Sequence, residues 1–162
     1  MVCNERAEYL VETYADMILR LSYSYLKNRE DARDICQNVL LKLLTDDRQF
    51  QNREHEKAFV LRVAINECKD LLKSPWRTRT CDIEACGELV SPQDPEGEVL
   101  EAVNALPEKY RVVIYLHYYE GYRAEEIAKL IGVSTNTVYT RLARGREKLK
   151  WILGGEAYGQ PV

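Results

Sequence analysis

Apolar residues recur every three to four positions through the first 73 residues, with polar residues between them. This period is typical of helices that bury one face, and it predicts helices over residues 5–26, 29–44 and 56–73. Asn28 is placed to cap the second helix. Pro75 ends the third, because the residue before a proline avoids the helical conformation. The buried stripe predicted for the first helix comprises Leu10, Tyr14, Met17, Ile18, Leu21 and Tyr25.

The second and third predicted helices each have an apolar and a polar face. The apolar stripe of residues 29–44 comprises Ala32, Ile35, Cys36, Val39, Leu40, Leu43 and Leu44. That of residues 56–73 comprises Phe59, Val60, Val63, Ala64, Cys68, Leu71 and Leu72. The polar faces carry Asp31, Asp34, Gln37, Asn38 and Lys42 on the second helix, and Arg62, Asn66 and Lys69 on the third. Taken alone, such polar faces are typical of solvated helix surfaces.

The second half opens with a short predicted helix from residue 98 through Leu106. The next stretch, YRVVIYLHYYEG (residues 110–121), fits two structures. Its β-branched and aromatic residues favour a strand. Its position favours a helix, since Pro107 suits the first turn of a helix and Gly121 suits the end of one. We predict a helix.

Residues 124–150 predict two helices joined by a tight turn. Gly132 ends the first helix, because glycine adopts the left-handed conformation without steric cost, and Ser134 is placed to cap the second. Val138 and Leu142 lie on the apolar face of the second helix. An ordinary helical hairpin is the alternative, but the small and apolar residues around the turn favour a DNA-binding helix-turn-helix. The outer face of the second helix comprises Asn136, Tyr139, Thr140, Arg141, Arg144, Arg146 and Lys148.

The net charge is −3, but the charges are unevenly distributed. Residues 57–80 carry a net charge of +4, residues 81–103 carry −7, and residues 104–153 carry +4. Two basic blocks around an acidic connector fit two DNA-contacting modules. The predicted fold class is therefore all-α: two small helical domains joined by a flexible acidic linker, the C-terminal one a helix-turn-helix. The expected bounds are residues 1–79 and 98–153 for the domains, 80–97 for the linker and 154–162 for a disordered tail.

Five cysteines without a C-x-x-C pair predict reduced thiols, and Cys36 and Cys68 fit small core residues. Cys81 and Cys86 lie in a polar stretch, where a redox role, a metal role and inert exposure all stay open. No apolar run reaches the ~18 residues of a membrane helix, and the N-terminus has no signal region, so we expect a cytoplasmic protein without membrane insertion. His55 and His117 stand in separate modules, and no nucleophile motif, metal-ligand spacing or phosphate loop occurs. We therefore expect no enzyme activity, cofactor or metal.

Three segments resemble parts of one family. Residues 31–44, DARDICQNVLLKLL, resemble the core-polymerase-binding helix of bacterial RNA polymerase sigma factors. Residues 58–72, AFVLRVAINECKDLL, resemble their promoter −10 helix, and residues 106–150 resemble their −35-binding domain. Short length and two helical modules resemble the extracytoplasmic-function (ECF) group. Phe59 stands where the family usually carries tryptophan, a mild change that should keep the core.

The resemblance implies partners and sites. The partners would be the core of bacterial RNA polymerase and promoter DNA, with an anti-sigma factor as a further candidate. Core polymerase would meet Asp31, Asp34, Gln37 and Asn38. The −10 element would meet Arg62, Asn66, Lys69, Trp76 and Arg77, although Trp76 equally fits a cap packed on the core. The −35 element would meet Ser134, Thr135, Asn136, Tyr139, Thr140, Arg141, Arg144, Arg146 and Lys148.

Two other functions compete with this one. A stand-alone helix-turn-helix regulator would have a similar C-terminal half, but it would need a dimer interface or sensor where this chain has residues 1–73. A helical adaptor that binds only proteins would not need the basic outer face of residues 136–148. The sequence therefore favours the sigma factor over both.

Overall fold

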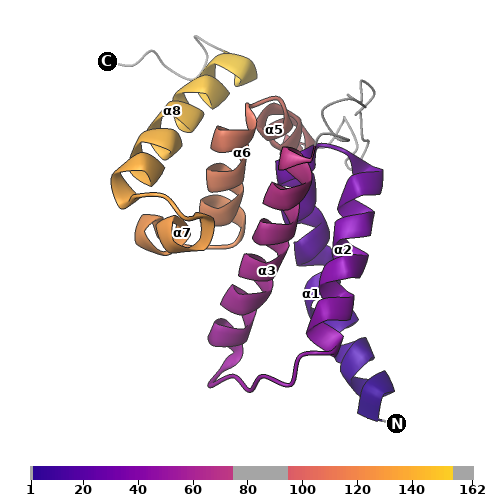
Figure 1. Cartoon of the computed structure of the whole chain (residues 1–162). Coiled ribbons are helices and arrows are strands. Elements are labelled where there is room, and N and C mark those ends of the chain that lie inside the picture. Colours follow the sequence, from indigo (N-terminus) through magenta and orange to yellow (C-terminus); the bar gives the residue numbers. More distant parts are fainter. Residues whose placement is uncertain (1, 75–94, 155–162) are drawn as a thin grey trace. The chain divides into compact units, whose positions relative to one another are not determined.

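The computed structural model describes residues 2–74 and 95–154. The chain divides into two compact units, residues 1–86 and 87–162, which are taken here one at a time (Figure 1). The described residues form helices and turns without a strand, which confirms the predicted all-α class. Several predictions lie outside the described residues: the acidic linker up to residue 94, the tail from residue 155, Trp76, Arg77, Cys81 and Cys86.

The first unit packs three helices, α1 (Val2–Leu26), α2 (Arg29–Leu44) and α3 (Arg53–Lys73), each against the other two. The bounds of α2 are those predicted. Both α1 and α3 begin three residues earlier than predicted. For α3 the cause is Asn52, whose side chain accepts a hydrogen bond from the backbone N–H of His55 at 2.8 Å. This cap starts the helix at Arg53, three residues before the predicted start at residue 56.

The buried surface of α3 is shifted relative to the predicted apolar stripe, of which four members are only half-buried: Phe59, Val63, Leu71 and Leu72. Val60, Ala64 and Cys68 are fully buried, as predicted, but so are Leu61 and Ile65, which the pattern misses. Because α3 packs against both α1 and α2, two adjacent stripes of its surface are covered. The largest fully buried side chains of this core are Leu10, Ile18, Leu21, Val39, Val60, Leu61 and Ile65.

Two thiols belong to this core. Cys36 and Cys68 are buried and outside any disulfide, as predicted, and burial raises the pKa of the Cys36 thiol. Within residues 2–74 and 95–154, no cluster of three or more histidine, cysteine or carboxylate side chains is arranged to hold a metal. No helix in the same described part combines the length and apolarity needed to cross a bilayer.

The second unit contains four α-helices and a π-helical turn among its described residues: α5 (Pro95–Asn104), α6 (Glu108–Ile114), η1 (Tyr115–Tyr119), α7 (Ala124–Ile131) and α8 (Thr135–Leu153). Helix α8 packs against α5, α6 and α7, and η1 contacts α6 and α7. Helix α5 begins at Pro95, so the predicted linker is too long by its last three residues. Proline suits the start of a helix, because its missing N–H has no intrahelical partner there.

The stretch that fitted both a strand and a helix is helical. Every residue from Tyr110 to Leu116 is buried, and a helix covered on all sides has no alternation of apolar and polar positions. This explains why its sequence looks like a buried strand. The prediction missed the widening of the helix into a π-helical turn at Tyr115–Tyr119. Arg111 is also buried, and its guanidinium donates to the carbonyl of Leu106 at 2.7 Å, which fixes the turn between α5 and α6.

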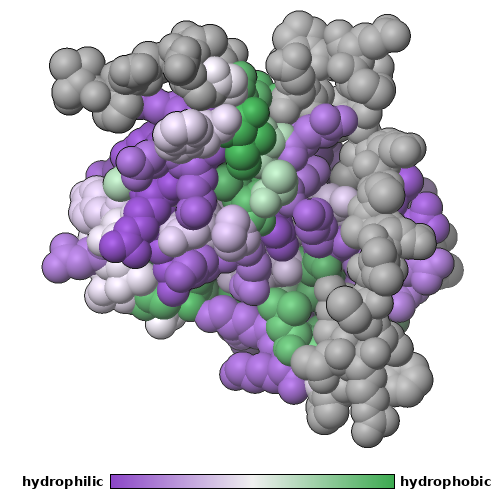
Figure 2. All heavy atoms as spheres, turned by 90° about the horizontal axis from the view of Figure 1, so that it is seen from above, coloured by the Kyte–Doolittle hydropathy of each residue, from purple (hydrophilic) through white to green (hydrophobic). Residues whose placement is uncertain are grey.

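Most of the described surface on the face shown in Figure 2 is hydrophilic, with smaller hydrophobic areas between. Single exposed apolar side chains are normal on soluble domains, so only those beside candidate contact residues enter the argument below. The large exposed apolar side chains are Val11, Leu41, Val99, Tyr118, Tyr119, Tyr139, Trp151 and Ile152.

Candidate functional site

Helices α7 and α8 form the predicted helix-turn-helix. Gly132 ends α7 with φ 79°, in the left-handed region that favours glycine. Ser134 caps α8, because its hydroxyl accepts a hydrogen bond from the backbone N–H of Thr137 at 3.1 Å. Val138 and Leu142 are buried on the inner side of α8. The turn chemistry read from the sequence is therefore confirmed.

The outer side of α8 divides into a middle and two flanks. At 3.6 residues per turn, positions four apart drift slowly across a face and positions seven apart almost coincide. Asn136, Thr140 and Arg144 thus form the middle, and all three are exposed. One flank carries Tyr139 and Arg146, both exposed, and the other carries the half-buried Arg141 and the exposed Lys148. At the N-terminal end of the helix, Ser134 is exposed and Thr135 is half-buried.

Two side chains on the first flank are bonded to residues outside α8. Tyr139 donates its hydroxyl hydrogen to the Glu125 carboxylate of α7 at 3.0 Å. This bond raises the pKa of Tyr139, while the backbone N–H of Glu125 and then Tyr139 lower the pKa of Glu125. Arg146 donates to the Tyr118 hydroxyl oxygen of η1 at 3.1 Å. Glu125 and Tyr118 were not predicted as site residues, since these contacts cross 14 and 28 positions of the chain.

The predicted −10 residues that the structure describes lie on α3. Arg62 and Asn66 are exposed and one helical turn apart, and Lys69 is half-buried one turn further along. The three therefore share one side of α3, as predicted. On α2, Asp34, Gln37 and Asn38 are exposed and Asp31 is half-buried.

One exposed residue extends the polar side of α2. Leu41 is 63% exposed and lies one turn beyond Gln37 and Asn38. Leu41 lies outside the predicted apolar stripe but is not among the predicted contact residues, because it belongs to the apolar run VLLKLL. Lys42, expected to be solvated on the polar face, instead pairs with Glu67 of α3.

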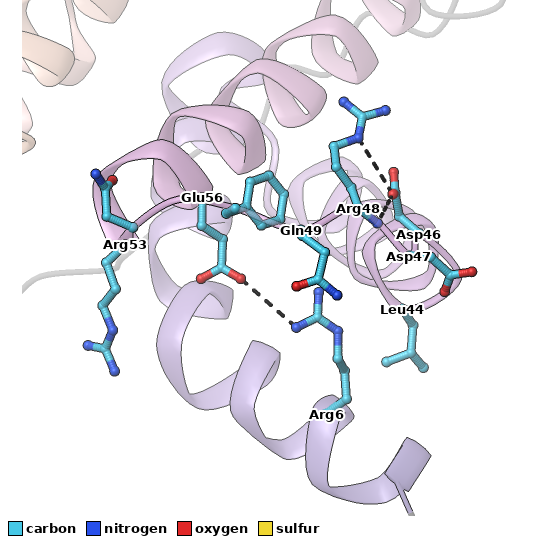
Figure 3. A pocket seen from close by; sticks show the side chains of 10 residues that line it. Arg6, Leu44, Asp46, Asp47, Arg48, Gln49, Arg53 and Glu56 are labelled. Carbon is cyan, nitrogen blue, oxygen red and sulfur yellow. Dashed lines mark hydrogen bonds and ion pairs between the residues drawn. The ribbon is translucent and has the colours of Figure 1, made fainter.

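The loop between α2 and α3 borders a pocket that was not predicted (Figure 3). It holds about 540 Å³ and is lined by Arg6, Leu44, Asp46, Asp47, Arg48, Gln49, Phe50, Asn52, Arg53 and Glu56. Figure 3 shows Arg6 directed at Glu56, and Arg48 directed at Asp46; the two ion pairs measure 3.9 and 3.6 Å. Polar, charged and aromatic side chains thus line one concave surface.

Glu56 is a buried carboxylate at the base of this pocket. One of its oxygens accepts hydrogen bonds from the hydroxyls of Tyr9 and Tyr14, both at 2.6 Å. Burial, followed by the bond to Glu56, raises the pKa of Tyr14; for Tyr9 the bond to Glu56 is the larger cause and burial the smaller. The arrangement ties the first turn of α3 to α1.

Comparison with known proteins decides the family. The family pattern described as Sigma-70 region 2 matches residues 10–78, and the one described as Sigma-70, region 4 matches residues 96–149. The chain is 32% identical over 134 residues to the RNA polymerase sigma factor SigV of Bacillus subtilis, covering 81% of each protein. It is 27% identical over 159 residues to the ECF RNA polymerase sigma factor SigW of the same organism, covering 87% of this chain and 85% of SigW. The chain belongs to the ECF sigma factors.

This sigma factor shares its fold with the sigma factor RpoE of Bartonella quintana, which was solved in complex with the anti-sigma factor NepR. The TM-score is 0.74 at 19% identity, with 92% of this chain and 97% of RpoE covered. The protein is thus an RNA polymerase sigma factor for transcription initiation, and its two units match regions 2 and 4 of Sigma-70. The stand-alone regulator and the helical adaptor are not favoured, because both halves match sigma factor regions.

Proposed function

We propose that α8 inserts into the major groove of the −35 element, with its middle reading bases and its flanks gripping phosphates. The capped helix-turn-helix with an exposed basic outer side carries this proposal. A helix with its side chains is about 10–12 Å wide, close to the ~12 Å width of the major groove. Asn136, Thr140 and Arg144 would then face base edges, with Ser134 and Thr135 at the entering end. The phosphate walls would meet Tyr139, Arg141, Arg146 and Lys148.

We propose that α3 binds the −10 element. Arg62, Asn66 and Lys69 lie on one side of the helix, where two cations and an amide suit a DNA backbone and a base edge. Trp76 and Arg77 follow α3 in the sequence and extend the proposed contact. The nearby carboxylate of Glu67 is paired with Lys42, so it does not neutralise the positive charge of this side of α3.

Opening the duplex requires a place for an unstacked base, and we propose that the pocket at the α2–α3 loop receives one. Unstacking costs a few kcal/mol per base, which stacking on an aromatic ring and hydrogen bonds to the base edge must offset. The pocket offers the ring of Phe50 and the amides of Gln49 and Asn52. Arg53 supplies a cation for a neighbouring phosphate.

We propose that core polymerase binds the outer side of α2. Asp34, Gln37 and Asn38 would supply charge and hydrogen bonds, with Asp31 at the start of the helix. Leu41 adds an exposed apolar contact at the end of this surface. A surface that combines polar groups with an exposed apolar side chain has the mixed composition of a non-obligate protein interface.

Three further parts of the proposal follow from the family. The protein would act in the cytoplasm, where core polymerase and promoters meet, and would work by binding rather than as an enzyme. The related RpoE was solved with an anti-sigma factor, so we propose such a protein as the inhibitor of this one. The domain for the −35 element would start with α5 at Pro95.

Run-off transcription with bacterial core polymerase on a library of promoter fragments tests the proposal. Discrete transcripts that require this protein are expected, and their start sites give both promoter elements. On the strongest promoter, Arg144→Ala should cost about 1–3 kcal/mol and relax −35 selectivity. Arg20→Ala, at an exposed arginine of the first unit, should change neither. Unchanged discrimination among −35 variants by Arg144→Ala would refute the base-reading role of Arg144.

A further inference from the structure

Tyr118 lies outside the helix-turn-helix, on the π-helical turn η1 that precedes it. Its side chain is 54% exposed, so the ring contributes little buried apolar surface to the fold. The turn is held in place by its neighbours: the rings of Tyr115 and Tyr119 stack with centroids 5.7 Å apart, and His117 Nδ1 bonds to the carbonyl oxygen of Tyr122 at 2.8 Å. The His117 ring in turn meets the Tyr118 ring edge-on at 4.7 Å. Tyr118 is therefore presented to solvent by a fixed scaffold.

The Tyr118 hydroxyl faces a cation on α8. Arg146 Nη1 donates to the hydroxyl oxygen at 3.1 Å. Among the ion pairs of the described residues, none joins a carboxylate to Arg146, so its positive charge is not neutralised by a neighbour. The guanidinium has five N–H donors, of which this bond uses one. The phenol accepts from Arg146 and can still donate its own hydrogen.

The Tyr118 hydroxyl and the Arg146 guanidinium are suited to bind the oxygens of one anionic group. A phenol that accepts a bond from a cation becomes a better donor, because chained hydrogen bonds polarise one another. Two converging donors, one of them charged, fit the geometry of a phosphate better than that of a base edge, which would need a matched acceptor pattern. Arg146 lies on a flank of α8 rather than in its middle, which is the position of a groove wall.

We propose that Tyr118 and Arg146 form a clamp for one backbone phosphate of the −35 element, so that the DNA interface extends from α8 onto η1. The clamp rests on the proposed placement of α8 in the −35 major groove. In it, Arg146 supplies the charge, and Tyr118 fixes the direction of the guanidinium and adds a second donor. Tyr118 thus contributes to affinity and register without reading sequence.

Phosphate replacement in the polymerase holoenzyme tests the clamp. On the promoter found by run-off transcription, each phosphate of the −35 region is replaced in turn by a neutral methylphosphonate, and binding is measured for four proteins: wild type, Tyr118→Phe, Arg146→Ala and Tyr119→Phe. Tyr118→Phe removes only a hydroxyl and should weaken binding to the unmodified promoter about fivefold. Tyr119→Phe, at the adjacent exposed tyrosine, should leave it unchanged.

The decisive result concerns one position. At one phosphate, the methylphosphonate should weaken wild-type binding about tenfold and weaken Tyr118→Phe and Arg146→Ala much less, since each has already lost part of the same contact. Arg146→Ala should also reduce the slope of the logarithm of the binding constant against the logarithm of the salt concentration by about 0.9, the value for one phosphate contact. The clamp alone would be overturned if Tyr118→Phe bound the promoter as tightly as wild type. It would also be overturned if Tyr118→Phe bound more weakly but kept the wild-type sensitivity to methylphosphonate at every phosphate. A wild-type protein insensitive to every −35 phosphate would overturn the placement of α8 as well.

Discussion

Helix α8 packs closely against α6 at Gly145, where there is little room for a side chain. Replacing Gly145 by alanine tests that packing. A Cβ added at Gly145 would lie 3.1 Å from Ile114 Cγ1, 3.2 Å from Ile114 Cδ1 and 3.4 Å from Tyr110 Cβ. Ile114 is 2% exposed, so it has no solvent to move into. Overpacking of this kind costs about 1–3 kcal/mol, whereas alanine in a helix gains about 0.8–1.0 kcal/mol over glycine. Subtracting the gain leaves an expected destabilisation of about 1 kcal/mol.

The measurement is urea unfolding of the full chain, followed by helical circular dichroism and by amide exchange in α8. Ala143→Gly is the matched control, because Ala143 is exposed on the same helix and its change should show the propensity effect alone, about 1 kcal/mol of destabilisation. Gly145→Ala should therefore destabilise although propensity favours it.

A double-mutant cycle locates the cause. Ile114→Val removes the Cδ1 atom and should cost about 0.5–1.5 kcal/mol alone. Combined with Gly145→Ala it should cost less than the sum of the two, by about 0.5 kcal/mol, because losing Cδ1 relieves the 3.2 Å contact while the γ carbon at 3.1 Å remains. If Gly145→Ala stabilised the protein by about 1 kcal/mol and the cycle gave no coupling, the close approach of the two helices would be wrong.

Three further predictions concern the first unit. Glu56→Gln keeps the shape but removes the charge that accepts from Tyr9 and Tyr14, and should destabilise the chain by about 1–2 kcal/mol in urea unfolding; an unchanged midpoint would mean that the two phenols do not depend on the carboxylate. Tyrosine ionises near pH 10 in an unfolded chain, whereas the pKa of Tyr14 is raised in the folded protein, so its contribution is complete below about pH 10 and falls as the pH rises. Tyr14→Phe should therefore flatten the loss of stability between pH 10 and 11 by about 1 kcal/mol, and equal slopes for both proteins would count against the raised pKa. Asp34→Lys should weaken binding to core polymerase by about 1–3 kcal/mol in a quantitative pull-down, while Glu12→Lys, on an exposed site of α1, should not; equal retention of both variants would remove α2 from the interface.

Local signals account for what the sequence predicts well. Asn28 accepts from the backbone N–H of Asp31 at 2.9 Å, and α2 begins and ends where predicted. Gly132 and Ser134 act within four residues of their own positions, so the helix-turn-helix follows from sequence alone. Phe59, the departure from the family's tryptophan, stays in an aromatic contact, with its centroid 5.3 Å from that of Phe50.

Contacts between distant positions account for what the sequence does not predict. The bonds from Tyr9 and Tyr14 to Glu56 span 47 and 42 positions, and no periodicity encodes them. Leu41 has the composition of a core residue, and its exposure depends on where α1 and α3 pack against α2. The π-helical turn at Tyr115–Tyr119 adds no distinctive residue type, so the sequence predicts a regular helix there. Leu41 and Tyr118, which the structure adds to the proposed interfaces, both belong to this second group.

Among the described residues, the two buried charged side chains occupy similar positions in their units. Glu56 stands in the first turn of α3, after the loop that borders the pocket, and Arg111 stands in α6, after the turn from α5. Each takes part in a directional bond with a neutral group: Glu56 accepts from two phenol hydroxyls, beside its ion pair with Arg6, and Arg111 donates to a backbone carbonyl. Apolar residues of similar volume often give equal or greater stability than buried charges, so net stability does not explain them. We infer that they fix loop geometry, since a directional bond to an ion holds a connection in one conformation where apolar packing would accept several. In the first unit that connection carries the proposed base-binding pocket, and a fixed pocket lowers the entropy that capturing a base would otherwise cost.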